Sequence, residues 1–214
     1  MELQNLRQQL EQKRAINSTI NYDEIALRRE TEEREMRLRS KLLSYENSVP
    51  KRYKKSSFEN FQGFGSLKSL LKSLQGGIII GGNGCGKTHL GFACCREAVI
   101  QGKSQSFITA FDYIQKVKNE FNSGRTGEVF KRYAKIDFLV IDEIDKRYGS
   151  STEFLEINRL INARYSEMLP TLLLSNAKDV QEIQDLLGMA VVDRLTEGGA
   201  IIPITAESYR QRIK

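Results

Sequence analysis

The stretch that decides the fold is IIIGGNGCGKTHL, from Ile78 to Leu90. Three consecutive isoleucines at its start are typical of a buried β-strand. The pattern G-x-x-x-x-G-K-[ST] follows from Gly81 to Thr88, and a helix is expected to begin near Lys87. A strand, a glycine-rich loop and a helix in this order predict a loop that binds the phosphates of a nucleoside triphosphate. The alternative is a glycine-rich turn that carries a surface lysine.

Each position of this loop has an expected chemical task. Glycines let the backbone curl so that several N–H groups point at phosphate oxygens, and the following helix adds the positive end of its dipole. Lys87 is expected to contact the β- and γ-phosphates, and the Thr88 hydroxyl to bind Mg²⁺. The predicted nucleotide-binding residues are Gly81, Gly82, Asn83, Gly84, Cys85, Gly86, Lys87, Thr88 and His89.

The chain has one histidine, His89, and three cysteines, Cys85, Cys94 and Cys95. A lone histidine beside the loop is more often a packed neighbour than a catalytic base. Adjacent cysteines point to different helix faces, and no C-x-x-C pair or second histidine accompanies them. We therefore expect reduced, packed thiols rather than a zinc site or a disulfide.

A second apolar run, FLVIDE, ends in the carboxylates of Asp142 and Glu143. Four consecutive apolar residues predict a buried strand, and this arrangement after a phosphate loop is typical of phosphate-loop ATPases. Asp142 is then expected in the Mg²⁺ shell, and Glu143 is expected to orient and deprotonate the attacking water. The alternative is an acidic pair on the surface.

A third strand, TLLLS, is followed by Asn176. A neutral amide at this place could sense the γ-phosphate and position the water. Taken alone, an asparagine after a strand is usually a turn residue or a helix cap, and this alternative stays open.

The amino-acid composition narrows the class of protein. The 214 residues carry 33 Lys and Arg against 27 Asp and Glu, a formal net charge of +6. This mild excess is compatible with an anionic partner such as nucleic acid. The N-terminus is charged from Glu2 onward, and no apolar run approaches the length of a membrane span. We therefore expect a cytoplasmic protein without a signal peptide.

From Ser57 onward, helix and strand patterns alternate. This alternation predicts an α/β fold with a five-stranded, parallel, doubly wound sheet. Ligands of such sheets bind beyond the carboxyl ends of the strands, where the phosphate loop falls. The expected strands are 78–80, 106–109, 138–142, 172–175 and 201–204, and the expected helices are 87–101, 111–121, 152–168, 179–187 and 207–212.

Residues 1–48 differ from the rest. Three leucines recur at helical spacing near the start, and a second helical stretch at about 22–45 has an entirely polar middle, RRETEERE. A helix that is polar on all sides cannot bury itself in a core, so we expect an arm that projects and docks a protein. A solvated, partly frayed helix is the alternative. The leucines are Leu3, Leu6 and Leu10.

A basic segment, KRYKK, follows the arm after Val49 and Pro50. It could contact phosphates or be a solvated linker. We therefore expect three parts: a helical arm at 1–48, a basic linker at 49–56 and an ATPase domain at 57–214.

The ordered motifs resemble a known family. VIDEI after GGNGCGKTHL, then LLLSNAK, LLGMAVVDRLTEGGA and ESYR, are similar to segments of the DnaC/DnaI-type helicase loaders, with the transposition ATPase IstB as a close relative. The resemblance covers about residues 49–212. It implies an AAA+ ATPase core that binds ATP and Mg²⁺. Few residues follow ESYR, so the C-terminal lid is expected to be reduced or absent.

The resemblance also implies assembly side by side, with ATP at the subunit boundaries. Arg194, in the VVDRL segment, matches the arginine finger that contacts the neighbour's γ-phosphate. Arg210, in ESYR, matches a second sensor arginine of the same subunit. Either could instead be a surface charge. The expected catalytic residues are Glu143, Asn176, Arg194 and Arg210.

A helical insert that contacts single-stranded DNA is a further implication of the resemblance. It corresponds to residues 111–133, where basic side chains alternate with aromatic ones, as suits phosphates and bases. Phe121 matches the family's aromatic residue in this insert, although it could equally belong to the core. The candidate DNA contacts are Lys116, Lys118, Phe121 and Arg125.

The leading hypothesis is an ATP-dependent loader of a replicative hexameric helicase onto single-stranded DNA. The arm would dock the helicase, self-association would complete the ATP sites, and slow hydrolysis would release the loader. An IstB-like transposition ATPase, which binds duplex DNA and recruits a transposase, is the alternative. A non-catalytic, nucleotide-dependent interaction module is a third possibility. Both a bacterial and a phage origin stay open.

Overall fold

The computed structural model describes residues 4–5, 7–9, 22–61, 67–125, 127–145 and 151–205. Every predicted strand is confirmed to within one residue at each end. The strands are β1 (Gly77–Gly81), β2 (Gln105–Thr109), β3 (Phe138–Asp142), β4 (Thr171–Ser175) and β5 (Ala200–Ile204).

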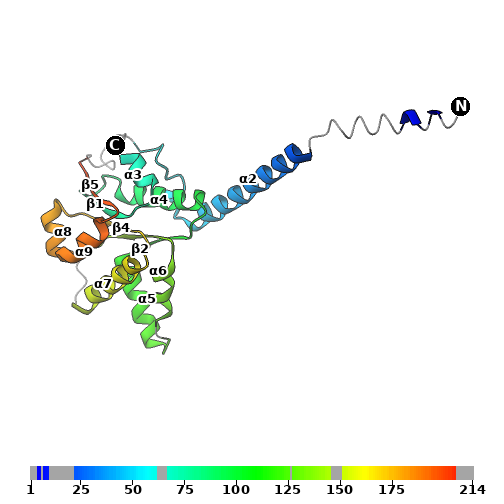
Figure 1. Ribbon diagram of the computed structural model, residues 1–214. Helices are drawn as coiled ribbons and strands as arrows, with labels where there is room; N and C mark the ends of the chain where they lie inside the picture. Colours follow the sequence, from blue (N-terminus) through cyan, green and yellow to red (C-terminus); the bar gives the residue numbers. More distant parts are fainter. Residues whose placement is uncertain are drawn as a thin grey trace. The chain divides into compact units, whose positions relative to one another are not determined.

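All neighbouring strands pair in parallel, in the order β2-β3-β4-β1-β5 (Figure 1). β1, β4 and β3 are therefore consecutive in space although far apart in the sequence. Because parallel strands end at the same edge, the segments that follow these three strands converge there. These are the segments that carry the predicted site residues.

Alternate residues of the central strands face two separate cores. Ile78 and Ile80 belong to one buried cluster, whereas Ile79 belongs to the other. Both faces of the sheet are covered, which explains why the central strands β1, β3 and β4 are nearly continuous apolar runs rather than alternating ones.

Helix α4 (Lys87–Ile100) covers one face of the sheet, and Gly91 lets it approach closely. A Cβ atom at Gly91 would lie 2.8 Å from Phe107 Cε2 and 2.9 Å from Leu174 Cδ1. Residues of five helices pack into the core on the opposite face. They are α5 (Ala110–Asn122), α6 (Glu128–Lys135), α7 (Ser151–Ser166), α8 (Val180–Leu187) and α9 (Met189–Thr196).

The helices predicted at 87–101, 111–121, 152–168 and 179–187 are confirmed as α4, α5, α7 and α8. The sequence patterns missed α3 (Leu67–Lys72), α6 and α9. These have only 6, 8 and 8 residues, so periodicity has too few turns to be recognised. The helix predicted at 207–212 and the three leucines near the start lie outside the described residues.

Arg164 is fully buried and ties α7 to its surroundings. Its guanidinium donates to Thr171 Oγ1 and to the carbonyls of Tyr133, Ile136 and Pro170, at 2.6–2.8 Å. Burial lowers the pKa of Arg164 to about 10, which leaves the group charged at neutral pH. The four hydrogen bonds compensate for the lost hydration of this charge.

The chain divides into two compact units, Met1–Lys41 and Leu42–Lys214. Helix α2 (Tyr22–Ser48) runs through the boundary. In the first unit its described side chains are largely exposed, and Glu33 pairs with Arg37 at 3.2 Å as the i,i+4 spacing allows.

The last turns of α2 belong to the second unit. The Tyr45 hydroxyl donates to the carbonyl of Phe92 at 2.7 Å, and Val49 is buried in the same core. The basic segment forms a short 3₁₀-helix, η1 (Lys51–Tyr53), and the Tyr53 ring stacks on Phe92 at 4.8 Å between centroids. This segment is therefore anchored to the domain by an aromatic contact. Among the described residues, none of the helices is both long and apolar enough to span a membrane.

Candidate nucleotide-binding site

The phosphate loop connects β1 to α4, as predicted, and α4 begins at Lys87. Gly86 is the residue before the helix and has φ of 103°, a conformation that residues with a side chain rarely adopt. A Cβ atom at Gly86 would lie 2.4 Å from the Phe61 ring, whereas one at Gly82 would meet nothing within 4 Å. The loop is therefore packed at Gly86 and open at Gly82.

The ammonium group of Lys87 is buried within this loop. It donates to the carbonyls of Gly81 (2.6 Å) and Gly82 (2.9 Å) and to Asn176 Oδ1 (2.9 Å). These three acceptors position the ammonium between the phosphate loop and the end of β4. A buried cation at this place offers a binding point for phosphate oxygens.

The Thr88 hydroxyl donates to Asp142 Oδ2 at 2.8 Å. This bond brings the start of α4 against the end of β3. Burial raises the pKa of Asp142, and hydrogen bonds from Thr88 and from the Glu143 N–H oppose this rise. A hydroxyl and a carboxylate side by side are the oxygen ligands that Mg²⁺ prefers.

The side-chain oxygens of Thr88 and Asp142 are suitable ligands for an Mg²⁺ ion that is bound together with a nucleotide. Within the described ranges, no group of three or more His, Cys, Asp or Glu side chains could hold a metal ion alone. Mg²⁺ usually keeps several waters and takes one or two protein oxygens together with substrate phosphates. Thr88 and Asp142 would supply such protein oxygens.

Glu143 follows Asp142 with φ of 58°, in the left-handed region that residues other than glycine seldom adopt. Its backbone N–H donates to Asp142 Oδ1 at 2.7 Å. Unfavourable backbone conformations of this kind concentrate at functional sites, where the surrounding structure holds them in place.

Asn176 does not cap the helix that follows it. Asp179 is the cap of α8, since its side chain accepts a hydrogen bond from the Glu182 N–H. The Asn176 amide instead lies between Lys87 and Asp145. Its Nδ2 donates to Asp145 Oδ2, and its backbone N–H to Asp145 Oδ1, both at 2.8 Å.

Asp145 was missed by the sequence analysis. Burial raises its pKa, but the hydrogen bonds from Asn176 outweigh this and hold the pKa below its usual value. The only signal in the sequence was a third acidic residue in the run IDEID. Its partner is far away in the sequence and is brought close by the pairing of β3 with β4.

His89 packs against residues 56–61. Its Nδ1 lies 3.3 Å from Ser56 Oγ and its Nε2 lies 3.1 Å from the Ser57 carbonyl, with the Phe61 ring beside it. Both ring nitrogens thus have protein partners. This agrees with a packed neighbour rather than a catalytic base, and its contact with nucleotide stays a prediction.

The three cysteines are free and buried, as expected. Burial raises the pKa of Cys94 and Cys95, so both are protonated thiols at neutral pH. Cys85 lies in the phosphate loop, with its Sγ 3.8 Å from Lys87 Nζ.

Arg194, on α9, is not part of this cluster. Its Nη1 donates to Asn162 Oδ1 on α7 at 2.6 Å, and its guanidinium lies 5.9 Å from the Tyr165 ring centroid. The Tyr165 hydroxyl donates in turn to Glu197. These contacts hold the side chain between α7 and α9, and its role as an arginine finger stays a prediction. Arg210 lies outside the described residues.

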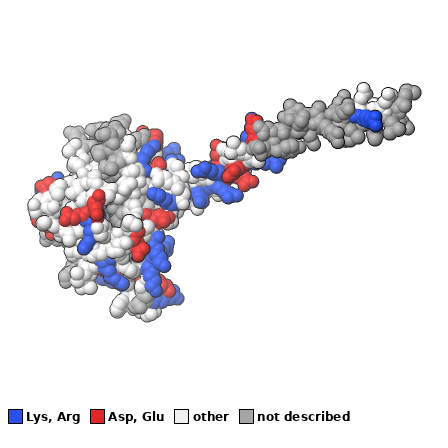
Figure 2. Space-filling model, in the orientation of Figure 1, with Lys and Arg blue, Asp and Glu red and all other residues white. Residues whose placement is uncertain are grey.

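The predicted insert is α5 and α6, between β2 and β3. Phe121 is 74% exposed at the end of α5, so its assignment to the core is wrong. Lys116 and Arg125 are exposed too, whereas Lys118 pairs with Glu153 on α7 at 2.5 Å. Figure 2 shows Lys and Arg side chains gathered where Figure 1 places α5 and α6.

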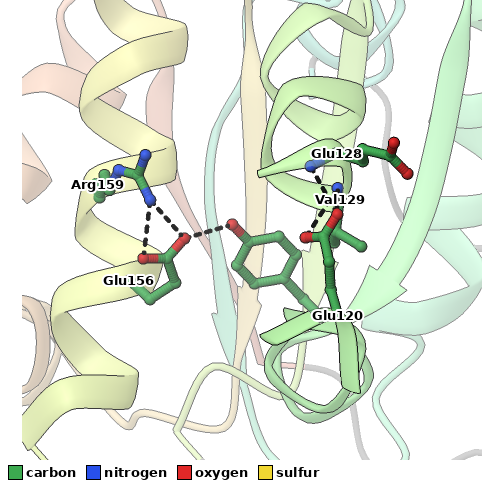
Figure 3. Close-up of polar contacts among 6 residues, drawn as sticks. Glu120, Glu128, Val129, Glu156 and Arg159 are labelled. Carbon is green, nitrogen blue, oxygen red and sulfur yellow. Dashed lines mark hydrogen bonds and ion pairs between the residues drawn. The ribbon is translucent and has the colours of Figure 1, made fainter. Parts of the chain in front are cut away.

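The two helices of the insert are fastened together by Glu120 (Figure 3). α6 has no side-chain cap of its own at Gly127. The Glu120 carboxylate accepts the N–H groups of Glu128 at 2.6 Å and Val129 at 3.0 Å, and so caps α6 from α5. Phe121 is the next residue of α5 after this capping glutamate.

Comparison with known proteins agrees with this geometry. The family described as "IstB-like ATP binding protein" matches residues 3–214. The replicative helicase loader DnaC of Escherichia coli K12 is 33% identical over 172 residues, which cover 73% of this chain and 70% of that protein.

Solved structures share the fold. The DnaC helicase loader superposes with a TM-score of 0.63 at 21% identity, over 73% of this chain and all (100%) of that one. AMPPCP-bound DnaA from Aquifex aeolicus superposes with a TM-score of 0.61 at 25% identity, over 78% of this chain and 54% of that one. The chain belongs to the IstB-like ATP-binding protein family of AAA+ ATPases, and it is a relative of the DnaC-type helicase loaders.

Proposed function

We propose that this protein is an ATP-dependent loader that places a replicative hexameric helicase on single-stranded DNA. The observation that carries the proposal is the 33% identity to the replicative helicase loader DnaC over 172 residues, which cover 73% of this chain. In the candidate nucleotide site, Lys87 is hydrogen-bonded to Asn176, and Thr88 to Asp142.

The site supports a phosphoryl-transfer mechanism. The Lys87 ammonium would exchange protein acceptors for phosphate oxygens and neutralise their charge. Thr88 and Asp142 would hold Mg²⁺, which when bound neutralises charge on the β- and γ-phosphates. Glu143 would take the proton of the attacking water, and Asn176 would help to orient that water.

Arg194 would complete the site of a neighbouring subunit. Its guanidinium would stabilise charge on the transferred phosphoryl group, so that hydrolysis is slow until subunits assemble. ATP binding would favour the assembled, DNA-gripping state, and hydrolysis would favour release. The ATP site then works as a switch between assembly and dissociation.

The insert would contact single-stranded DNA. Phe121 offers an exposed ring for base stacking, and Lys116 and Arg125 offer charge for phosphates. Lys118 is engaged by Glu153 and would have to exchange partners to contribute.

Helicase transfer onto closed circular single-stranded DNA tests the proposal directly. A ring-shaped helicase cannot thread onto a circle that has no end, so unwinding of an annealed oligonucleotide reports loading. The full chain with ATP should stimulate unwinding, and Lys87→Ala should not. Equal unwinding with and without the protein would overturn the proposal.

The arm is tested by a truncated chain, through its ATPase activity and its co-purification with the helicase. Removal of residues 1–41 leaves Tyr45 and Val49 in the core, so the remaining domain should fold. We expect it to hydrolyse ATP but to lose co-purification with the helicase. Retained binding would reject the docking role of the arm.

An IstB-like transposition ATPase is the second candidate, favoured by the family match over residues 3–214. It would bind duplex DNA and recruit a transposase. Titrations of single-stranded and duplex DNA at several salt concentrations distinguish the two, since a loader should prefer single strands at every salt concentration.

A further inference from the structure

The amide of Asn176 is held from two sides by groups of opposite hydrogen-bonding character. Lys87, which can only donate, lies 2.9 Å from Oδ1, and the Asp145 carboxylate, which accepts, lies 2.8 Å from Nδ2. Turning the amide over would set donor against donor and acceptor against acceptor. The network therefore fixes which end of the amide faces which neighbour.

The backbone explains how Asp145 reaches this place. The Ile144 N–H donates to the Leu174 carbonyl at 3.3 Å, so the pairing of β3 with β4 extends beyond the strand ends. Asp145 then accepts the Asn176 N–H at 2.8 Å as well as its Nδ2. Two bonds to one carboxylate leave the Asn176 side chain little freedom.

We propose that Asp145 is a positioning residue that holds Asn176 with its carbonyl oxygen, rather than its NH₂ group, toward the phosphate site. The inference rests on the proposed ATPase function and deepens it. Phosphate oxygens are acceptors, so an oxygen presented by Asn176 cannot bind them. It can accept a hydrogen bond from Lys87 or from the attacking water. Asn176 is thereby assigned to the water, and Asp145 acts through it.

A double-mutant cycle tests this dependence. Asp145→Asn keeps the size of the side chain but removes its acceptor-only character. We expect kcat for ATP hydrolysis to fall by about tenfold to a hundredfold, because the Asn176 amide would no longer be held in place. The Kd for ATP should stay within about threefold. Asn176→Ala should lower kcat by a similar factor, and the double variant should lose no more than Asn176→Ala alone. Losses that multiply would show that Asp145 acts independently and would overturn the proposal.

Asp137 provides a matched control. It lies just before β3, at the opposite end from the site, and accepts two hydrogen bonds from Ser104 at 2.7 Å each. Asp137→Asn makes the same chemical change to another carboxylate that accepts two hydrogen bonds. It should leave kcat unchanged. A loss equal to that of Asp145→Asn would mean that any such change disturbs the domain, and the proposal would fail.

A second readout does not depend on hydrolysis. In protein labelled with ¹⁵N-asparagine, the side-chain signal of Asn176 is identified by its loss in Asn176→Ala. Its solvent-exchange rate should rise by about tenfold or more in Asp145→Asn, because a charge-assisted bond is removed. An unchanged rate would reject the role of Asp145. If the wild-type chain did not hydrolyse ATP at all, the proposed function would fail while this measurement would still report on the amide.

Discussion

Glu143 occupies a backbone conformation that costs free energy, next to the predicted Mg²⁺ ligand Asp142. A glutamate at this φ is less favourable than a glycine, which is consistent with a functional role for its carboxylate. The chemistry expected there is proton abstraction from water, which requires an ionised group close to the γ-phosphate.

Glu143→Gln should therefore leave ATP binding intact and lower the rate of hydrolysis by about a hundredfold or more. ATP should remain bound and stabilise the assembled state, which light scattering measures alongside nucleotide affinity. Glu167→Gln, on the exposed surface, serves as the control. Wild-type turnover in Glu143→Gln would reject the assignment of the base.

A second single residue, Arg164, is expected to contribute strongly to the stability of the fold. Arg164→Leu would remove the guanidinium donors of three carbonyls and of the Thr171 hydroxyl, although the Pro170 carbonyl would keep the Leu139 N–H. We expect a loss of about 3 kcal/mol or more in the free energy of unfolding, measured by urea denaturation. Arg159→Leu is the matched control, since its guanidinium is largely exposed and its ion pair should contribute less than about 1 kcal/mol.

At the scale of elements, the α5–α6 insert combines a rigid base with an exposed tip. Glu120 caps α6 from α5, and Lys118 joins α5 to α7. Phe121, next to Glu120 in α5, is 74% exposed. An exposed aromatic side chain on a fixed support loses little entropy when it stacks on a base.

Phe121→Ala should weaken binding to single-stranded DNA by about 1–3 kcal/mol, the contribution of one stacked base. ATP affinity should not change. Phe111→Ala tests the same residue type at the other end of α5, and fluorescence anisotropy measures both variants. Equal losses in the two would show that the effect is not specific to the insert tip.

At the scale of the whole molecule, no arginine takes part in the hydrogen bonds of Lys87, Thr88, Asp142 and Asn176 among the described residues. Arg194 is bound to Asn162 on the α7–α9 surface, apart from Lys87 and Asp142. If Arg194 of a second copy of the chain acted on this site, hydrolysis would depend on assembly.

Mixing two inactive variants tests this arrangement. Lys87→Ala removes a site but leaves the finger, and Arg194→Ala removes the finger but leaves the site. The mixture should regain ATPase activity, because one variant completes the site of the other. Each variant alone at the same total concentration is the control, and a mixture no more active than the two alone would place the action of Arg194 within its own subunit.

The sequence predicted the strands, the phosphate loop and the acidic strand end because these depend on local rules. Consecutive β-branched residues favour a buried strand, and the glycine spacing suits only a few loop conformations. The resemblance added the AAA+ family, which the comparisons confirm. The roles of Arg194 and Arg210 stay predictions.

Tertiary structure alone decided which polar groups meet. Asp145 and Asn176 belong to segments that follow different strands, and only the order β3-β4-β1 brings them to Lys87. The same holds for Arg164, whose acceptors come from α6 and the start of β4. Local sequence fixes what each segment forms, because backbone conformation depends on near neighbours. The partners of a buried charge depend on strand order, which is set by the packing of the whole domain.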